Sequence, residues 1–142
     1  MPRASLFCQR FDVTGADFAN AGKASIRIKT ILREIGIDPA VIRRVAIASY
    51  EAEMNVVLYA RRGVMELKVT PKDIGIGVED EGDGIPDVEL AMQEGYSTAS
   101  DEIRELGFGA GMGLPNIKKN ADRFSISSVP GKGTTLEITF GL

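Results

Sequence analysis

Two blocks of this sequence combine polar side chains with glycines in a pattern that suits ligand binding. The first reads Glu-Asp-Glu-Gly-Asp-Gly-Ile-Pro over residues 79–86, directly after an alternating apolar run at residues 74–78 that predicts a strand. Asp80 therefore falls at or just past a strand end, where a carboxylate is well placed to hydrogen-bond a ligand. The turn after it contains the further candidate binding residues Gly82, Gly84 and Ile85.

The second block reads Gly-Phe-Gly-Ala-Gly-Met-Gly-Leu-Pro over residues 107–115 and leads into a short predicted helix at residues 114–121. Glycine at every second position leaves no side chains to pack in a strand, so the pattern indicates close approach of the backbone to another group. Free N–H groups at the start of the helix suit phosphate. The alternatives are a flexible loop without a ligand and a dinucleotide-binding turn, but residues 100–106 are too polar for the buried strand that such a turn follows. The candidate binding residues here are Gly107, Gly109, Gly111, Met112, Gly113 and Leu114.

A long predicted helix, residues 39–61, carries a third polar feature. Glu51 and Asn55 lie one turn apart between two apolar stripes, so the helix directs a carboxylate and an amide into an otherwise buried region. Burial of such groups costs several kcal/mol unless they find partners, which favours a polar cavity. The alternative is that the pair caps a loop or hydrogen-bonds internally. Glu53 lies about 160° from Glu51 around the helix axis and is expected in solvent.

The periodicity of the rest of the sequence predicts the strands and helices that position these residues. Strands are predicted at residues 5–13, 64–70, 74–78, 124–129 and 134–140, and helices at residues 17–35, 39–61 and 114–121. Gly36 and Gly63 are expected to end the first two helices, and Asp38 and Pro39 to begin the second. The long helix is expected to bury Val41, Val45, Ala48, Ala52, Val56 and Tyr59 on one stripe and Ile47, Met54 and Leu58 on the other, and to leave Arg44 and Arg62 in solvent near its ends. The predicted fold is an α+β two-layer sandwich, in which a mostly antiparallel sheet of about five strands carries three main helices on one face.

Composition narrows the class of protein. The chain has 142 residues, the size of a single domain spanning residues 1–142. Its net charge of −3 and the absence of any Lys/Arg run longer than two residues argue against nucleic-acid binding. No apolar stretch suits a membrane span or a signal peptide, so a cytoplasmic location is expected. Histidine is absent, which excludes His-based acid/base chemistry and phosphohistidine on this chain. The lone Cys8 is interpreted as a small strand residue rather than a nucleophile.

Four blocks in order resemble the nucleotide-binding boxes of the GHKL ATPases, the superfamily of gyrase, histidine kinases and mismatch-repair ATPases. The blocks are Glu51-x-x-x-Asn55, Asp80-x-Gly82-x-Gly84, the glycines from Gly107 to Gly113 with Leu114, and Gly133-Thr134. The resemblance covers nearly the whole chain from about residue 15, and the order and spacing of the four blocks are more specific than any one block. Within the superfamily, the Glu-Ala-x-x-Asn and Gly-Tyr-Ser-Thr segments look most like the anti-sigma-factor serine kinases of partner-switching and stressosome pathways.

The resemblance implies a role for each matching residue. Asp80 would accept the adenine amino group, Glu51 would act as general base, and Asn55 would bind Mg²⁺. The glycines from 107 to 113 would close over the phosphates of ATP as a lid, so residues 95–112 are expected to become ordered when nucleotide binds. The other implied nucleotide-binding residues are Gly82, Gly84, Ile85, Met112, Leu114 and either Thr134 or Thr135. These roles agree with the chemistry, because Mg²⁺ prefers oxygen ligands and phosphoryl transfer to a hydroxyl needs one carboxylate near the acceptor.

The function implied by the resemblance is that of an ATP-dependent serine/threonine kinase whose substrate is a STAS-type anti-sigma-factor antagonist. One alternative is an ATP-binding module that sequesters a sigma factor or an activator. A second is a catalytic domain serving a separate histidine-bearing partner. The resemblance also leaves a homodimer open. Residues 99–106 make the segment before the glycines longer than in the nearest switch kinases.

Overall fold

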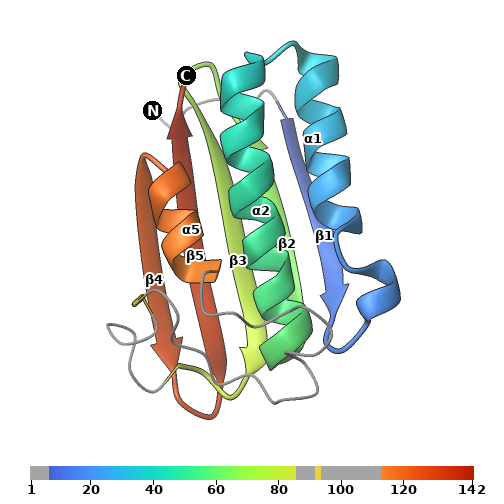
Figure 1. Ribbon diagram of the computed structural model, residues 1–142, viewed down its shortest axis with the longest axis vertical. Helices are drawn as coiled ribbons and strands as arrows, with labels where there is room; N and C mark the ends of the chain where they lie inside the picture. Colours follow the sequence, from blue (N-terminus) through green and yellow to red (C-terminus); the bar gives the residue numbers. More distant parts are fainter. Residues whose placement is uncertain (1–6, 86–91, 94–112) are drawn as a thin grey trace.

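The computed structural model describes residues 7–85, 92–93 and 113–142, and in this part the chain forms one antiparallel sheet covered on one face by helices (Figure 1). The strand order is β1-β2-β3-β5-β4, and every neighbouring pair is antiparallel. The elements are β1 (Phe7–Thr14), η1 (Phe18–Asn20), α1 (Lys23–Ile35), α2 (Pro39–Tyr59), β2 (Ala60–Val69), β3 (Asp73–Gly82), α5 (Gly113–Asn120), β4 (Arg123–Val129) and β5 (Gly133–Gly141). The predicted α+β two-layer architecture is confirmed.

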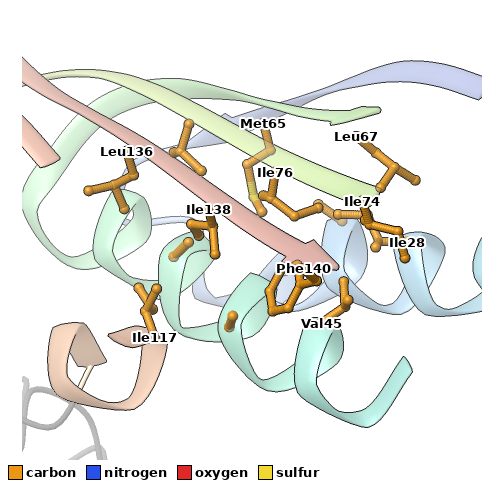
Figure 2. Close-up of a cluster of buried hydrophobic side chains, with 14 of the residues drawn as sticks. Ile28, Val45, Met65, Leu67, Ile74, Ile76, Ile117, Leu136, Ile138 and Phe140 are labelled. Carbon is orange, nitrogen blue, oxygen red and sulfur yellow. The ribbon is translucent and has the colours of Figure 1, made fainter. Parts of the chain in front are cut away.

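The core lies between the sheet and the helices, and strand alternation decides which residues enter it. Alternate residues of β3 and β5, such as Ile76 and Ile138, point toward the helices and are buried (Figure 2). Ala48 and Ala52 of α2 have no exposed surface, and their small side chains let this helix lie close to the sheet. Helix α2 lies between α1 and α5, so it contacts both helices as well as the sheet. It is therefore the element that connects the two sides of the helical layer.

Several local predictions are confirmed. The Asp38 side chain accepts a hydrogen bond of 2.8 Å from the Ala40 N–H at the start of α2, as expected of an N-cap residue. Gly36 ends α1 as predicted. Residues 64–70 and 74–78 belong to the β2–β3 hairpin, and Cys8 is an exposed strand residue.

The end of the long helix was predicted wrongly. Helix α2 ends at Tyr59 and strand β2 begins at once with Ala60, so Gly63 lies within the strand rather than at a helix end. Gly63 pairs with Val13 of β1 on one side and with Asp80 of β3 on the other. Pairing with two neighbouring strands gives the backbone at Gly63 its hydrogen-bond partners. The helical pattern of the sequence does not show that these strands lie beside Gly63.

The apolar stripes of α2 were also only partly right. Val45, Ala48, Ala52 and Val56 are buried as predicted, but Ile47 and Tyr59 are each 39% exposed. The predicted solvent exposure of Arg44 is likewise wrong. Its Nη2 atom lies 2.9 Å from Asp122 Oδ1, its Nε donates to the Asn120 carbonyl at 2.9 Å, and its guanidinium lies over the Phe140 ring. Arg62 is exposed, but on strand β2, where it pairs with Glu81.

The largest correction concerns the first helix and Glu53. The predicted helix over residues 17–35 is interrupted: a short 3-10 helix is followed by Gly22, which has a φ of +94°, and α1 begins only at Lys23. Glu53 of α2, expected in solvent, is only 2% exposed and lies at this break. Its carboxylate accepts hydrogen bonds from the N–H groups of Gly22 (2.9 Å), Ala24 (3.3 Å) and Ser25 (2.9 Å) and from the Ser25 hydroxyl (2.6 Å).

Glu53 therefore caps α1 from a neighbouring helix. The first N–H groups of a helix have no partner within it, and a negative charge there is also favoured by the helix dipole. The same four bonds explain how a carboxylate can be buried in this position. These bonds also fix how the part of α2 that carries Glu51 and Asn55 sits against the start of α1.

No helix in the described part of the chain combines the length and apolar character needed to cross a membrane.

Candidate functional site

The described candidate residues gather at one end of the molecule, where α2 and β3 end and α5 begins (Figure 1). They form two clusters. One is built on α2 and α5 around Glu51, and the other on β3 and the β4–β5 hairpin around Asp80.

The Glu51 cluster brings the polar pair of α2 against the first residue of α5. A Cβ atom added at Gly113 would lie 3.2 Å from Asn55 Oδ1 and 3.4 Å from Glu51 Oε2. Both side chains are half-buried. The absence of a side chain at Gly113 therefore lets the start of α5, whose first N–H groups have no partner within the helix, approach a carboxylate and an amide oxygen.

Asn116 is a residue of this cluster that the sequence analysis missed. Its Nδ2 atom donates a 3.3 Å hydrogen bond to Glu51 Oε1, which orients the carboxylate. The alternative that the Glu51–Asn55 pair hydrogen-bonds internally is thus met for Glu51, by a residue of another helix. A usable signal was present, because Asn116 follows Gly113 by three residues, one turn of the predicted helix.

The Asp80 cluster ties β3 to β5. Asp80 Oδ1 accepts a 3.0 Å hydrogen bond from the Thr134 N–H, and Thr134 itself is buried. Asp80 is the third residue from the end of β3, consistent with its predicted place at a strand end. Burial raises the pKa of the Asp80 carboxyl, and the hydrogen bond from Thr134 opposes that shift. A half-buried carboxylate with spare acceptor capacity is a group that a ligand N–H can satisfy.

Ser128 completes this cluster and was also missed by the sequence analysis. Its hydroxyl accepts a 2.6 Å hydrogen bond from the Ile85 N–H and lies 2.9 Å from Thr134 Oγ1. The turn after Asp80 is thereby attached to the β4–β5 hairpin, an attachment that the Gly131 N–H reinforces by donating to the Asp83 carbonyl at 2.7 Å. Strand β4 contains three serines, so the sequence offered no signal that singled out Ser128.

Gly84 occupies a position that only glycine fits well. Its φ is +77°, and an added Cβ would lie 2.5 Å from the Val129 carbonyl oxygen. An added Cβ at Gly82 would lie 2.9 Å from the Tyr59 carbonyl oxygen. Close packing of the turn against its neighbours therefore accounts for both glycines, independently of any ligand.

The remaining predicted residues divide into three groups. Leu114 is buried in the core, and Ile85 packs against its edge. Thr135 lies on the opposite face of the sheet from Thr134, because successive strand residues alternate, and of these two alternatives it is Thr134 that hydrogen-bonds Asp80. Gly107, Gly109, Gly111 and Met112 lie outside the described residues, as does the predicted lid over residues 95–112.

Comparison with known proteins relates this chain to one family. A family model described as a histidine kinase-like ATPase domain matches residues 15–140. The serine/threonine-protein kinase RsbT of Bacillus subtilis is 33% identical over 113 residues, which cover 77% of this chain and 79% of RsbT. The anti-sigma F factor of Caldanaerobacter subterraneus subsp. tengcongensis is 34% identical over 110 residues, 72% of this chain and 73% of that protein.

Solved structures confirm the fold. A chain of the SiaB–SiaC complex from Pseudomonas aeruginosa superimposes with a TM-score of 0.67 over 97% of this chain and 90% of its own length, at 12% identity. The histidine kinase domain of the blue-light activated kinase EL346 from Erythrobacter litoralis gives a TM-score of 0.52 over 86% of this chain and 61% of its own, at 18% identity. The predicted relationship to the GHKL ATPases is confirmed by the family match over residues 15–140 and by these relatives. The chain belongs to the histidine kinase-like ATPase domain family and, within it, is similar to a serine/threonine-protein kinase and to anti-sigma F factors.

Proposed function

We propose that this chain binds Mg-ATP across the two clusters and transfers the γ-phosphoryl group to a serine or threonine of a STAS-type anti-sigma-factor antagonist in the cytoplasm. The observation that carries the proposal is the contact of Glu51 and Asn55 with the first residue of α5. It sets a carboxylate and an amide oxygen beside the start of a helix, an arrangement suited to binding phosphate and a metal ion and to accepting a proton from a hydroxyl.

In this proposal the Asp80 cluster holds the adenine. Asp80 has one oxygen bonded to the Thr134 N–H, and its carboxylate retains capacity to accept a hydrogen bond from the adenine amino group. Guanine presents a carbonyl oxygen at the same place, and two facing acceptors repel, so ATP is expected to bind in preference to GTP. The bonds of Ser128 hold the turn of Gly84 and Ile85 in position beside this carboxylate.

In this proposal the Glu51 cluster binds the phosphates and the metal ion. An amide oxygen is a ligand that Mg²⁺ accepts, so Asn55 would hold the ion, which neutralises charge on the phosphates when bound. Backbone N–H groups from Gly113 onward would contact phosphate oxygens, and the glycines at 107, 109 and 111 would close over them.

Glu51 acts as general base in this proposal. The substrate hydroxyl gives its proton to the Glu51 carboxylate, the hydroxyl oxygen forms the new bond to the γ-phosphorus, and the bond to the β–γ bridging oxygen breaks so that ADP leaves. Asn116 donates to one Glu51 oxygen and so keeps the other directed away from it. A fixed orientation of the base favours proton transfer, which needs hydrogen-bond distance to the acceptor hydroxyl.

The test is transfer of label from γ-labelled ATP to a purified STAS-domain protein encoded in the same genome. Label on serine or threonine that survives acid treatment supports the proposal. Acid-labile label on a histidine of a partner would replace it with the histidine-kinase alternative. Absence of any label transfer to STAS-domain proteins would leave the kinase without its proposed substrate and reject that part of the proposal.

A second candidate function is sequestration, in which ATP shapes a surface that holds a sigma factor or an activator. It is supported by the 34% identity to proteins named anti-sigma F factor. Glu51→Gln separates the two functions in cells. Regulation that is lost together with phosphorylation identifies catalysis as the function, whereas regulation that persists without phosphorylation identifies sequestration.

Asp80→Asn is predicted to weaken ATP binding without destabilising the folded protein. Loss of a charge-assisted hydrogen bond should weaken ATP binding by about 1.5–3 kcal/mol. The folded protein should not be destabilised at pH 7. Burial raises the pKa of Asp80 in the folded state. Stability therefore falls as the pH rises from the ordinary pKa of an aspartate through this raised pKa. Asparagine does not ionise, so it avoids that loss. Calorimetric titration with ATP and thermal denaturation measure the two effects.

The matched control is Asp83→Asn, which removes an exposed carboxylate from the same turn. It should change neither ATP affinity nor stability. ATP affinity in Asp80→Asn equal to that of the wild type would remove the adenine role from Asp80.

A further inference from the structure

A groove runs between α1 and α2 on the outer side of the helical layer, apart from the Glu51 and Asp80 clusters. It has a volume of about 520 Å³ and is open to solvent. Residues of the two helices and of the loop between them line it: Lys29, Arg33, Ile37, Pro39, Ile42, Arg43, Ala46 and Ile47. We call these residues the α1–α2 groove.

Three cationic side chains, those of Lys29, Arg33 and Arg43, line the groove, and its other lining residues in the described part of the chain are apolar. None of the three forms an ion pair with any carboxylate in the described part of the chain. The whole chain carries a net charge of −3, and the exposed residues Glu34 and Asp38 adjoin the groove in sequence, but the groove lining itself carries three positive charges. Unpaired cations gathered in one groove are electrostatically complementary to an acidic partner.

The floor of the groove is apolar. Ile42 is buried, whereas Ile37 is half-buried and Ile47 is 39% exposed, although its position in the helical pattern predicted burial. An apolar floor with charged residues at the margin is the arrangement of a protein-binding groove, in which apolar contacts supply affinity and charges select the partner.

One end of the groove points along α2 toward the proposed catalytic base. Ile47 precedes Glu51 by four residues on α2, about 6 Å along the helix axis. Pro39, at the other end of the groove, precedes Glu51 by twelve residues, about 18 Å along the helix axis. A partner segment in the groove would therefore leave the rest of the partner free to reach the Glu51 cluster.

We propose that the α1–α2 groove is a docking site for an acidic amphipathic segment of the protein partner. The inference rests on the proposed function for the identity of that partner, but not for the chemistry of the segment. Glutamates or aspartates of the segment pair with Lys29, Arg33 and Arg43, and its apolar side chains cover Ile37 and Ile47. A membrane surface fits less well, because the site is a concave groove with three cations on a chain of net negative charge.

The direct test uses a fluorescently labelled amphipathic helical peptide with leucines on one face and glutamates on the other. Fluorescence anisotropy should show binding to the wild type that weakens as salt is raised. Arg33→Glu and Arg43→Glu should each reduce the affinity by about tenfold. The matched control is Arg27→Glu, an exposed arginine of α1 outside the groove, which should bind as the wild type does.

A second matched pair of variants tests the apolar floor of the groove. Ile47 and Ile35 have the same exposed fraction, 39%, but only Ile47 lines the groove. Ile47→Ser should weaken peptide binding and Ile35→Ser should not. Thermal denaturation of all five variants shows whether any loss of binding comes from unfolding instead.

The link to catalysis is tested with the STAS-domain protein that the chain phosphorylates. Arg33→Glu should raise KM for that protein by about tenfold and leave kcat and KM for ATP unchanged. If no STAS-domain protein is phosphorylated by the wild type, the proposed substrate fails while the peptide experiment still decides the groove. Equal peptide affinity in Arg33→Glu, Arg43→Glu and Arg27→Glu would overturn the docking site.

Two further outcomes would also overturn it by showing a different occupant. One is binding of the wild type to phosphatidylserine vesicles that is lost in Arg33→Glu and Arg43→Glu while the acidic peptide does not bind. The other is a dimer in sedimentation velocity that the same two substitutions dissociate, which would assign the groove to a second copy of the chain.

Discussion

Glu51→Gln is expected to lower the rate of phosphoryl transfer by about 10²–10⁴-fold, the range of general-base catalysis. Glutamine keeps the shape of the side chain and can still accept the hydrogen bond from Asn116, but its amide does not take up a proton at neutral pH. ATP affinity should stay within about twofold of the wild type, because the proposed adenine and metal contacts are made by Asp80 and Asn55. Single-turnover phosphorylation and ATP titration measure the two quantities.

The control for this variant is Glu34→Gln, which removes an exposed carboxylate from α1. It should leave the transfer rate unchanged. A transfer rate in Glu51→Gln close to that of the wild type would mean that another group accepts the proton, or that none is needed. A parallel loss of ATP affinity would instead assign Glu51 to binding.

Glu53→Gln is expected to destabilise the fold by about 3 kcal/mol, a large effect for one substitution. Glutamine offers one acceptor oxygen where the carboxylate offers two, and its NH₂ group would face donors. At least one N–H group at the start of α1 then stays buried without a partner. In a chain of this length the midpoint of thermal unfolding should fall by roughly 10 °C.

Thermal denaturation checks this value, and hydrogen exchange should show the loss of protection concentrated in the first turn of α1. Glu51→Gln is the matched control, because it makes the same chemical change two residues away on the same helix. It should lose activity and keep its stability, whereas Glu53→Gln should lose stability. An unfolding midpoint in Glu53→Gln equal to that of the wild type would show that the cap does not contribute to folding.

Glu51 and Glu53 show what a helical pattern in a sequence predicts and what it does not. The pattern correctly placed Glu51 and Asn55 on one face and Glu53 on another. It did not reveal what lies against that other face, and the expectation of solvent was wrong because the broken start of α1 lies there. A helical wheel gives the direction of a side chain, while its neighbours depend on how the helices pack.

The same reason explains the other misses. Arg44 was expected in solvent because the pattern of α2 does not include the chain after α5, to which its side chain binds. Asn116 and Ser128 were missed because each acts on a residue far away in the sequence, Glu51 and Ile85 respectively. Such contacts leave no local periodicity to detect.

The sequence by itself determined the order and type of the elements, the α+β class, the capping of α2 by Asp38, and the four blocks that relate the chain to its family. Alternation, helical periodicity and turn residues are local properties, and each predicts structure through the preferences of neighbouring residues. Only the tertiary structure decided the break before α1, the burial of Glu53, the choice of Thr134 over Thr135, and the cationic groove between α1 and α2. These features arise where residues distant in the chain meet, because hydrogen bonds and burial depend on which surfaces face each other after the helices have packed on the sheet.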